Sequence, residues 1–252
     1  MVFITGDTHG SFEKLSHRNF PEGKRLTKND YVIICGDFGL WHPTTSEDYW
    51  LQWLEQLQFN VCWCDGNHEN FDRIYSDEFQ TIDFHGGKAQ KIRDNVFHLM
   101  RGEVFNIDGC RFFAFGGASS HDIEDGILDP DEFKSDEEFV DALHRWRKTS
   151  KRFRVNHHSW WKDELPSSAE MQHGIESLQQ NGFAVDYVVS HCLPTSASKL
   201  LGYYGSDILT DYFDRIVNDY QLDFNRWYCG HYHRDISFGQ FTIKYHDIER
   251  VV

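Results

Sequence analysis

Five polar turns in the sequence carry side chains that bind metal ions, and each turn follows a short apolar run. They are Asp7-x-His9, Gly36-Asp37, Gly66-Asn67-His68-Glu69, His191 and Gly230-His231-Tyr232-His233. Together they offer carboxylate, amide and imidazole groups without thiolate, a set that suits Mn, Fe, Zn or a related transition metal better than calcium. Each motif alone is common, because a glycine often simply ends a strand. Their joint occurrence after apolar runs predicts a metal site.

The apolar runs that precede these turns have β character and cover residues 2–5, 31–35, 61–64, 187–190 and 227–229. Their apolarity is continuous rather than alternating, which predicts strands buried on both faces. Amphipathic patterns over residues 46–57 and 207–220 predict helices between strands, and this alternation favours the α/β class. Because the carboxyl ends of strands in such sheets gather at one edge, turns far apart in sequence can converge there.

The middle of the chain has a different pattern. Short strands are predicted over residues 88–92, 96–99, 104–107 and 111–115, separated by turn signals such as Asp94-Asn95 and Asp108-Gly109. This pattern predicts a β-meander and therefore a mixed sheet. A similar hairpin is predicted near the end, with strands over 235–238 and 241–246 around Gly239-Gln240.

The five turns, in this order, resemble the motif set of the calcineurin-like metallophosphoesterase superfamily, and they span nearly the whole chain. The resemblance implies a four-layer α/β/β/α sandwich of two mixed β-sheets flanked by helices, formed by a single domain over residues 1–252. It also implies two divalent transition-metal ions, such as Mn, Fe, Zn or Ni. One ion would be bound by Asp7, His9 and His233, the other by Asn67, His191 and His231, and Asp37 would bridge both.

The resemblance further implies hydrolysis of phosphomonoester or phosphodiester bonds through a metal-bridging hydroxide, with Asp37, Asn67 and His68 as the catalytic residues. A carboxylate at Asp37 is needed because an anion with two oxygens can bridge two cations. Asn67 offers a neutral oxygen, which limits the ligand charge. His68 would donate a proton to the leaving oxygen or stabilise it. The alternative for His68 is a structural histidine bonded to Glu69 or to the backbone.

The sequence departs from the superfamily's protein phosphatases at the second turn. These enzymes extend it to Gly-Asp-x-x-Asp-Arg, whereas residues 36–41 here read Gly-Asp-Phe-Gly-Leu-Trp. The departure disfavours a Ser/Thr protein phosphatase. Arg73 is a candidate replacement for the phosphate-binding arginine, with a surface arginine on a helix as the alternative. The turn at residues 116–122 is a candidate substrate-side loop, because its glycines would let backbone amides approach an anion.

The charge pattern of one segment differs from that of the rest of the chain and predicts an inserted arm at about residues 118–165. Residues 118–141 contain ten acidic side chains and one lysine, and residues 142–162 contain seven basic side chains and no acidic one. Two interpretations are open: solvated faces of opposite sign that dock on each other or on the body, or a lid over the substrate. The paired Trp160 and Trp161 are predicted to anchor the arm rather than stack on a nucleobase.

The amino-acid composition limits the classes of partner and the cellular compartment that are expected. With 25 Lys and Arg against 40 Asp and Glu, the net charge of −15 disfavours long nucleic acids. Aromatic residues make up 16% of the chain, which excludes disorder over most of it. The apolar start is too short for a signal peptide, and no later stretch predicts a membrane span. The six cysteines predict buried thiols in a reducing cytoplasm rather than disulfides or a zinc site.

The favoured function is therefore a cytoplasmic hydrolase that acts on a small phosphorylated or nucleotide substrate. Two alternatives stay open. A nuclease would need the basic stretch of residues 142–162 as a track for DNA or RNA. A non-catalytic scaffold on the same fold is disfavoured, because all seven predicted ligand positions keep side chains that bind metals.

Overall fold

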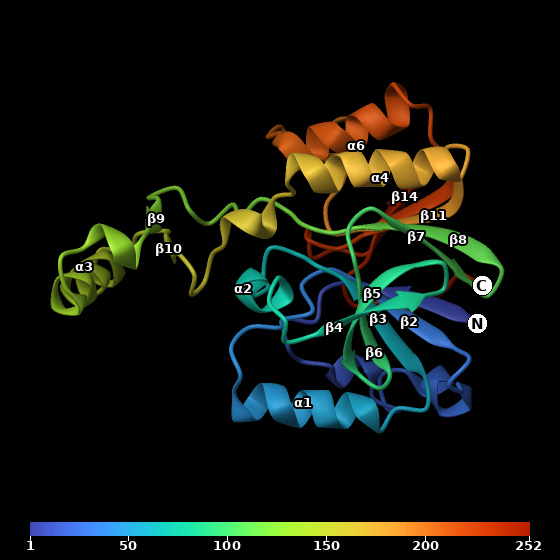
Figure 1. Ribbon diagram of the computed structural model, residues 1–252, viewed down its shortest axis with the longest axis horizontal. Coiled ribbons are helices and arrows are strands. Elements are labelled where there is room, and N and C mark those ends of the chain that lie inside the picture. The colour runs from blue at the N-terminus through green and yellow to red at the C-terminus, as the bar shows by residue number, and fades with distance from the viewer.

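The computed structural model covers residues 1–252 and contains two large β-sheets that lie between helices (Figure 1). The first sheet has seven strands in the order β15-β1-β2-β3-β6-β5-β4. Strands β1, β2, β3 and β6 are parallel to one another, whereas β15 and the hairpin of β4 and β5 pair antiparallel. In chain order the strands are β1 (Val2–Thr5), β2 (Tyr31–Cys35), β3 (Asn60–Cys64), β4 (Gln80–Phe84), β5 (Gly87–Arg93), β6 (Val96–Leu99) and β15 (Glu249–Arg250).

The second sheet has six strands in the order β13-β14-β12-β11-β8-β7. Strands β8, β11, β12 and β14 are parallel, and the two edge strands β7 and β13 are antiparallel to their neighbours. In chain order they are β7 (Glu103–Ile107), β8 (Cys110–Phe115), β11 (Ala184–Ser190), β12 (Asp223–Cys229), β13 (Ile236–Phe238) and β14 (Phe241–Ile243). Both sheets are mixed, which confirms the predicted class.

The predicted β-meander is wrong in one respect, because its strands belong to two different sheets. Strand β6 pairs with β3 and β5 in the first sheet, whereas β7 begins the second sheet only a few residues later. Local turn signals fix the hairpins of β5 with β6 and of β7 with β8. They carry no information on the long-range pairing of β6 with β3, which decides the sheet to which each hairpin belongs.

Strand residues alternate between two cores, which explains the continuous apolar runs. In β1, Phe3 packs in the outer core beneath α1 (Thr45–Glu55), and Ile4 packs between the two sheets. In β8, Phe112 lies between the sheets, and Phe113 packs in the core beneath α4 (Ser168–Gln180) and α6 (Ile208–Asn218). The order of layers is therefore helix, sheet, sheet and helix, as the four-layer prediction requires.

Capping side chains set where the main helices begin. The Thr44 side chain accepts a hydrogen bond from the backbone N–H of Glu47 at the start of α1. Asp207 and Thr210 form a reciprocal capping box at the start of α6. The helices predicted over 46–57 and 207–220 are thus confirmed with ends shifted by one or two residues. Two further helices are short, α2 (Phe71–Ile74) and α5 (Thr195–Leu200).

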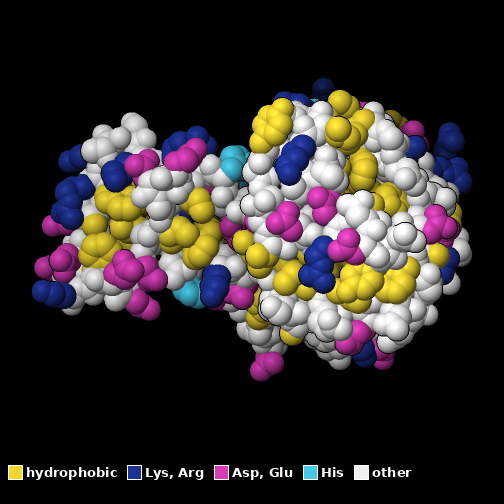
Figure 2. Space-filling model, turned by 90° about the horizontal axis from the view of Figure 1, so that it is seen from above, with side chains coloured by type: hydrophobic (Ala, Val, Ile, Leu, Met, Phe, Trp, Pro, Cys, Tyr) yellow, Lys and Arg dark blue, Asp and Glu magenta, His cyan; other side chains and the backbone are white.

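The segment between β8 and α4, residues 118–165, is called the arm because it protrudes from the body (Figures 1 and 2). It contains β9 (Ile127–Leu128), α3 (Asp136–Lys148) and β10 (Arg154–Val155), and the two strands pair in parallel. A small apolar cluster of its own includes Leu128, Ala142 and Val155.

Acidic and basic parts of the arm dock on each other, which is one of the two interpretations of its charge pattern. Ion pairs join Arg154 to Asp122 at 2.7 Å, Arg152 to Glu124 at 2.6 Å and Lys151 to Asp125 at 3.7 Å.

The arm is anchored at its base by Trp161, which is buried in the core beneath α1. Its indole N–H donates a hydrogen bond to Asp72 at 2.7 Å. This placement agrees with the anchoring role predicted for the tryptophan pair. All six cysteines are unpaired, and five of them are buried. The structure has no helix that combines the length and apolarity needed to cross a membrane.

Candidate metal centre

The five polar turns all lie at the carboxyl ends of strands that run in parallel with a neighbour in their sheet. Asp7 and His9 follow β1, Asp37 follows β2, and Asn67 follows β3; His191 follows β11, and His231 and His233 follow β12. Four of these residues have left-handed backbones: His9 (φ 47°), Asp37 (φ 48°), His231 (φ 67°) and His233 (φ 49°). Non-glycine residues adopt this conformation rarely and at a cost, and such residues concentrate at functional sites.

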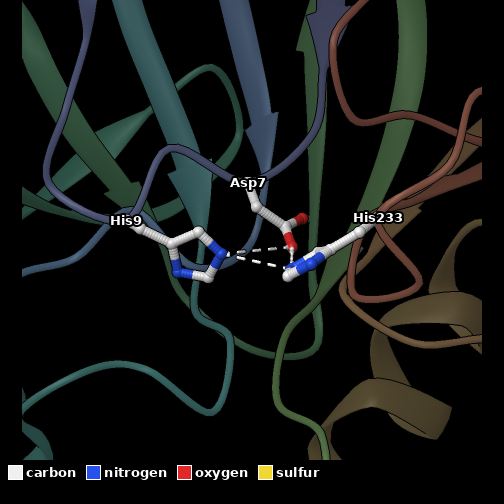
Figure 3. A group of neighbouring side chains, drawn as sticks. All are labelled: Asp7, His9 and His233. Atoms are coloured by element: carbon white, nitrogen blue, oxygen red, sulfur yellow. Dashed lines mark hydrogen bonds and ion pairs between the residues drawn. The ribbon is translucent and has the colours of Figure 1, made fainter.

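Asp7 and His9 from one turn and His233 from another point toward one another (Figure 3). The Nε2 atom of His233 lies 3.1 Å from Asp7 Oδ2 and 3.2 Å from His9 Nε2. His9 Nε2 lies 3.8 Å from Asp7 Oδ2. One carboxylate oxygen and two imidazole nitrogens within 4.8 Å of one another form a group that can hold a metal ion. These are the residues predicted to share one ion.

Asp37 lies between this group and the rest of the centre. Its Oδ1 atom is 3.2 Å from His191 Nε2, and its Oδ2 atom is 3.6 Å from His9 Nδ1. Asp37 belongs to two candidate metal groups, one with His9 and His68 and one with Asp7 and His191. Its two carboxylate oxygens thus face different neighbours, an arrangement compatible with the predicted bridging position.

Asn67 and His231 complete the predicted set; Asn67 is buried, and His231 is partly exposed. The side-chain amide of Asn67 donates to Ser120 Oγ at 3.3 Å, and its Oδ1 atom has no hydrogen-bond partner. The ring of His231 lies 5.0 Å from that of His191, centroid to centroid. Burial lowers the pKa of His231 to about 3, which keeps this imidazole neutral and its ring nitrogens available as ligands.

The charge balance of the centre favours a bound cation. Burial opposes a charge on His191, yet the carboxylates of Asp37 and Asp7 raise its pKa to about 10. His191 in turn keeps the pKa of the Asp37 carboxyl below its usual range, although burial acts in the other direction. The two buried carboxylates therefore favour positive charge in the centre.

Three buried atoms of the predicted ligands make no hydrogen bond: Asp7 Oδ2, Asn67 Oδ1 and His191 Nε2. The predicted ligand His233 lies beside Asp7 Oδ2, and the predicted ligand Asp37 lies beside His191 Nε2. Leaving a buried polar atom without a partner costs roughly 1–3 kcal/mol, and most such atoms in folded proteins are paired. Three unsatisfied atoms in one cluster of carboxylate, amide and imidazole groups fit the binding of divalent transition-metal ions.

Neighbouring backbone groups fix the orientation of these ligands. The backbone N–H groups of His68 and His231 donate to Asp37 Oδ1 at 2.9 Å and to Asp7 Oδ1 at 3.0 Å. His191 Nδ1 lies 2.8 Å from the carbonyl oxygen of Cys35, which leaves Nε2 facing the centre. Such a contact from the second ring nitrogen is typical of histidine ligands. The sequence offered no signal for this partner, because it is a backbone atom.

Glycines next to two ligands permit this close packing. A Cβ atom at Gly66 would collide with Asp37 Oδ1, and a Cβ atom at Gly230 would collide with Asp7 Oδ1. These glycines therefore do more than end strands, because they make room for the carboxylates.

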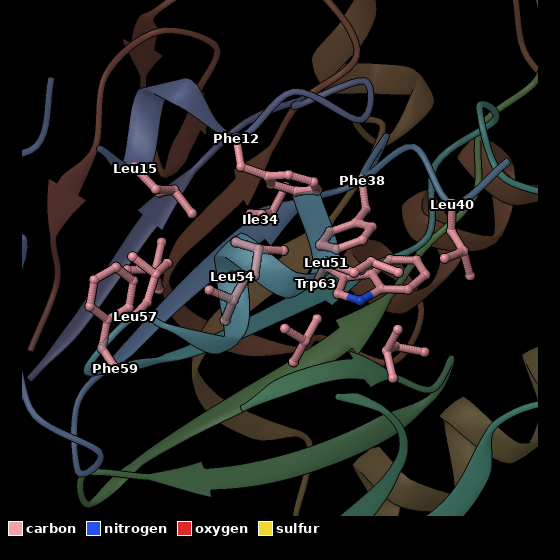
Figure 4. Packing of buried hydrophobic residues seen from close by; sticks show 14 of the residues in the cluster. Phe12, Leu15, Ile34, Phe38, Leu40, Leu51, Leu54, Leu57, Phe59 and Trp63 are labelled. Atoms are coloured by element: carbon pink, nitrogen blue, oxygen red, sulfur yellow. The ribbon is translucent and has the colours of Figure 1, made fainter. Parts of the chain in front are cut away.

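Aromatic packing stabilises the turn after β2, where Phe38 lies in the buried core with Trp63 (Figure 4). Phe38, next to Asp37, stacks on Trp63 with centroids 4.6 Å apart. The buried Glu69 carboxylate accepts hydrogen bonds from the backbone N–H groups of Phe38, Gly39 and Leu40 at 2.7, 3.1 and 2.8 Å. Glu69 is thus bonded to this turn and not to the His68 ring, which removes one form of the structural alternative for His68.

The His68 ring lies at the edge of the centre, with its centroid 5.2 Å from that of His9. Its Nε2 atom lies 3.1 Å from Nη2 of Arg154, a residue of the arm that sequence reasoning did not single out. Burial lowers the pKa of His68 to about 4. Arg154 lies 86 positions from His68, so only the fold reveals their contact.

Arg73, the candidate replacement for a phosphate-binding arginine, is held elsewhere. Its guanidinium pairs with Glu47 at 2.8 Å and with Glu78 at 2.6 Å, and it donates to the Trp41 carbonyl at 3.1 Å. Two carboxylates already neutralise this cation, so a structural role on α2 is favoured.

The turn at residues 116–122 does lie beside the centre, but two of its backbone amides are already hydrogen-bonded. The backbone N–H of Gly117 donates to Asp65, and that of Ser120 donates to Glu164. Side chains make the approach: Ser120 contacts Asn67, and the ring of His121 lies 5.6 Å from that of His231. A cavity of about 590 Å³ opens next to this turn, with His121, His231, His233, Tyr203 and Tyr204 among its lining residues.

The family model of the calcineurin-like phosphoesterases matches residues 1–235. No curated protein matches the chain. Among solved structures, the chain is similar to a putative 5'-nucleotidase from Staphylococcus aureus in complex with alpha-ketoglutarate, with 13% sequence identity and a TM-score of 0.43. The similarity covers 97% of this chain and 48% of the nucleotidase, so the chain spans about half the length of that protein.

Proposed function

The chain belongs to the calcineurin-like phosphoesterase family, and from this premise we propose that it hydrolyses phosphoric esters with the help of bound divalent metal ions. The observation that carries the proposal is the set of buried atoms on Asp7, Asn67 and His191 that make no hydrogen bond and lie among other candidate ligands. Their chemistry matches a metal centre, and a merely structural polar cluster would leave them unsatisfied at a high cost in free energy.

The candidate ligands divide between two ions. We assign Asp7, His9 and His233 to one ion and Asn67, His191 and His231 to the other, with Asp37 in contact with both. The group of Asp7, His9 and His233 supports the first assignment, and the two groups that contain Asp37 support its central position. When bound, two such ions would supply Lewis-acid polarisation of the phosphoryl oxygens and lower the pKa of water. Mn, Fe, Zn and Ni are the candidate metals.

His68 is proposed to stabilise the leaving oxygen or to donate a proton to it. Its backbone is fixed by the bond to Asp37, and its ring nitrogen Nε2 is presented at the edge of the centre. A ring nitrogen in this position can exchange a proton with an ester oxygen held at the ions.

A small phosphorylated or nucleotide substrate is favoured over a nucleic acid. The cavity of about 590 Å³ beside His231 and His233 has the size of a small-molecule site. The basic stretch that a nuclease would need is partly neutralised, because Lys151, Arg152 and Arg154 pair with acidic residues of the same arm. Phosphomonoesters and phosphodiesters both remain within the proposal.

The test is hydrolysis of p-nitrophenyl phosphate and bis-p-nitrophenyl phosphate by metal-stripped protein resupplied with Mn, Ni, Fe(II), Zn or Mg. We expect at least one metal to restore turnover, and we expect Asp37→Asn and His68→Ala each to lower kcat by about 100-fold or more. His68→Ala should keep its bound metal, measured by elemental analysis, whereas Asp37→Asn should lose some.

The matched control is Asp83→Asn, which changes an exposed carboxylate far from the centre and should be as active as the unaltered protein. Absence of bound metal together with absence of turnover under every condition would contradict the proposal. Bound metal without turnover of either ester would favour the scaffold.

A further inference from the structure

The arm places one arginine against the candidate metal centre. The Arg154 side chain is only 10% exposed, and it makes four polar contacts. Its Nε and Nη2 atoms donate to the two carboxylate oxygens of Asp122 at 2.7 and 2.8 Å, and Nη1 donates to the Ser159 carbonyl at 2.9 Å. The fourth contact joins Nη2 to His68 Nε2 at 3.1 Å. The bidentate pair with Asp122 orients the plane of the guanidinium.

The hydrogen bonds of Arg154 leave capacity for an anion. A guanidinium has five N–H groups, and the four contacts occupy four of them. One N–H is free, and the one that contacts His68 binds an uncharged acceptor atom, the ring nitrogen Nε2. A phosphate oxygen is a stronger acceptor than that nitrogen, because it is charged. A phosphate bound at the metal centre would therefore compete for this N–H.

We propose that Arg154 is the phosphate-binding arginine of this site and that Asp122 is its positioning residue. The proposal rests on the proposed phosphoesterase function. On substrate binding, a non-bridging phosphate oxygen takes the place of His68 Nε2 as the acceptor from Nη2. The exchange neutralises part of the phosphate charge and frees His68 Nε2 to face the leaving oxygen. No covalent bond forms or breaks in this step.

The strand pairing of the arm explains how Arg154 reaches the centre. Arg154 is the first residue of β10 and pairs with Ile127 of β9, just beyond the acidic segment that holds Asp122. The neighbouring Arg152 also pairs with an acidic residue, Glu124, but both of these side chains are 55% exposed. A merely structural ion pair would resemble that of Arg152, whereas Arg154 makes the additional contact with a residue of the centre.

The experiment titrates the Mn-loaded protein with inorganic phosphate by calorimetry and measures kcat and KM with p-nitrophenyl phosphate. We expect Arg154→Ala to weaken phosphate binding by about 10- to 100-fold, because a charge-assisted hydrogen bond to the phosphate is lost. Arg154→Lys should recover part of that loss, since it keeps the charge without the fork of donors. Arg152→Ala, which removes the exposed neighbour, should bind phosphate as the unaltered protein does.

Asp122 is tested by a double-mutant cycle. Asp122→Asn should raise KM more than it lowers kcat, and it should weaken phosphate binding less than Arg154→Ala does. The double variant should bind phosphate no more weakly than Arg154→Ala alone, because Asp122 acts through Arg154. A purely structural role for the pair would instead lower the unfolding temperature without changing phosphate affinity.

Equal phosphate affinity in Arg154→Ala and the unaltered protein overturns the inference, as does an unaltered protein that binds no phosphate. The proposed function fails separately, when the unaltered protein hydrolyses neither ester with any metal. The phosphate titration needs no turnover, so the two failures are distinguishable.

Discussion

The ligand turns of the body and the arm beside them are held in place by different kinds of interaction. In the body, four candidate ligand residues have left-handed backbones, each of which costs roughly 1–3 kcal/mol. These turns are fixed by buried contacts, such as the stacking of Phe38 on Trp63 and the hydrogen bonds to Glu69. The centre is thus rigid because the cores beneath it tolerate little rearrangement.

The arm depends on weaker interactions. Two of its three ion pairs lie largely in solvent, and exposed pairs contribute roughly 0–1 kcal/mol each. Its own apolar cluster has three buried members, against 21 in the core beneath α1. The contrast indicates that the two regions have different roles. The body fixes the candidate ligands, and the arm, which is more easily displaced, supplies Arg154. The variants below test this difference between the body and the arm, beginning with the largest expected effect.

Trp161→Ala tests whether the arm depends on the body. Trp161 is 1% exposed within the core beneath α1, so its removal leaves a large cavity. We expect the free energy of unfolding, measured by urea denaturation, to fall by about 3–5 kcal/mol. The control is Trp160→Ala, since the adjacent tryptophan is partly exposed and lies outside that core.

Metal and phosphate binding distinguish the two regions in this variant. If the arm alone is displaced, Trp161→Ala should keep its metal affinity and bind phosphate more weakly. A variant that loses metal and phosphate affinity in parallel would show that the regions are one cooperative unit.

The strands and ligand turns were predictable because their signals are local. Because β2 is buried on both faces, its sequence is a continuous apolar run. A glycine such as Gly66 stands where a candidate carboxylate ligand packs closely against the backbone of a turn. The positions of β6 and Arg154 were not predictable, since both depend on long-range pairing. Proximity in sequence to His68 suggested Arg73, but the fold places Arg73 between Glu47 and Glu78.

The role of the 116–122 turn shows a similar limit. Its glycines suggested free backbone amides, and its position beside the centre agrees with that reading. The N–H of Ser120 is nevertheless taken by Glu164, a residue 44 positions away. No local pattern reveals that a distant carboxylate will satisfy this amide, and the contacts of the turn with Asn67 and His231 are made by the side chains of Ser120 and His121.

The side chain of Glu164 joins the end of the arm to its start at Ser120, and its burial predicts a dependence of stability on pH. Burial raises its pKa to about 7, above the 4.5 of an unfolded glutamate. The protonated form is thus favoured in the folded state, and its contribution to stability is lost as the pH rises from about 4.5 to 7. This loss is on the order of 3 kcal/mol, and it levels off above pH 7.

Glu164→Gln should remove this pH-dependent change in the free energy of unfolding, because glutamine does not ionise. Its neutral amide can keep both contacts with Ser120. The measurement is the unfolding free energy in urea from pH 4.5 to 8, for both proteins in chelator. We expect the difference between the two curves to change most between pH 4.5 and 7. Parallel curves over this range would show that Glu164 ionises normally and that the junction is open to water.

Gly66→Ala tests the rigidity of the body with the smallest change. The added Cβ atom would collide with Asp37 Oδ1, and Asp37 cannot move freely because its carboxylate also accepts the N–H of His68. A displaced carboxylate should weaken metal binding by about 10- to 100-fold, as loss of an orienting contact does elsewhere. Competition with a metal-sensitive dye measures this affinity.

Gly109→Ala is the matched control, because Gly109 has a left-handed backbone with φ 82° and open space around its Cα. Alanine there strains a turn between β7 and β8 and should lower stability by about 1–2 kcal/mol while leaving metal affinity unchanged. Equal metal affinity in both variants would mean that the centre adjusts around Asp37, and the contrast between a rigid body and a displaceable arm would then have to be abandoned.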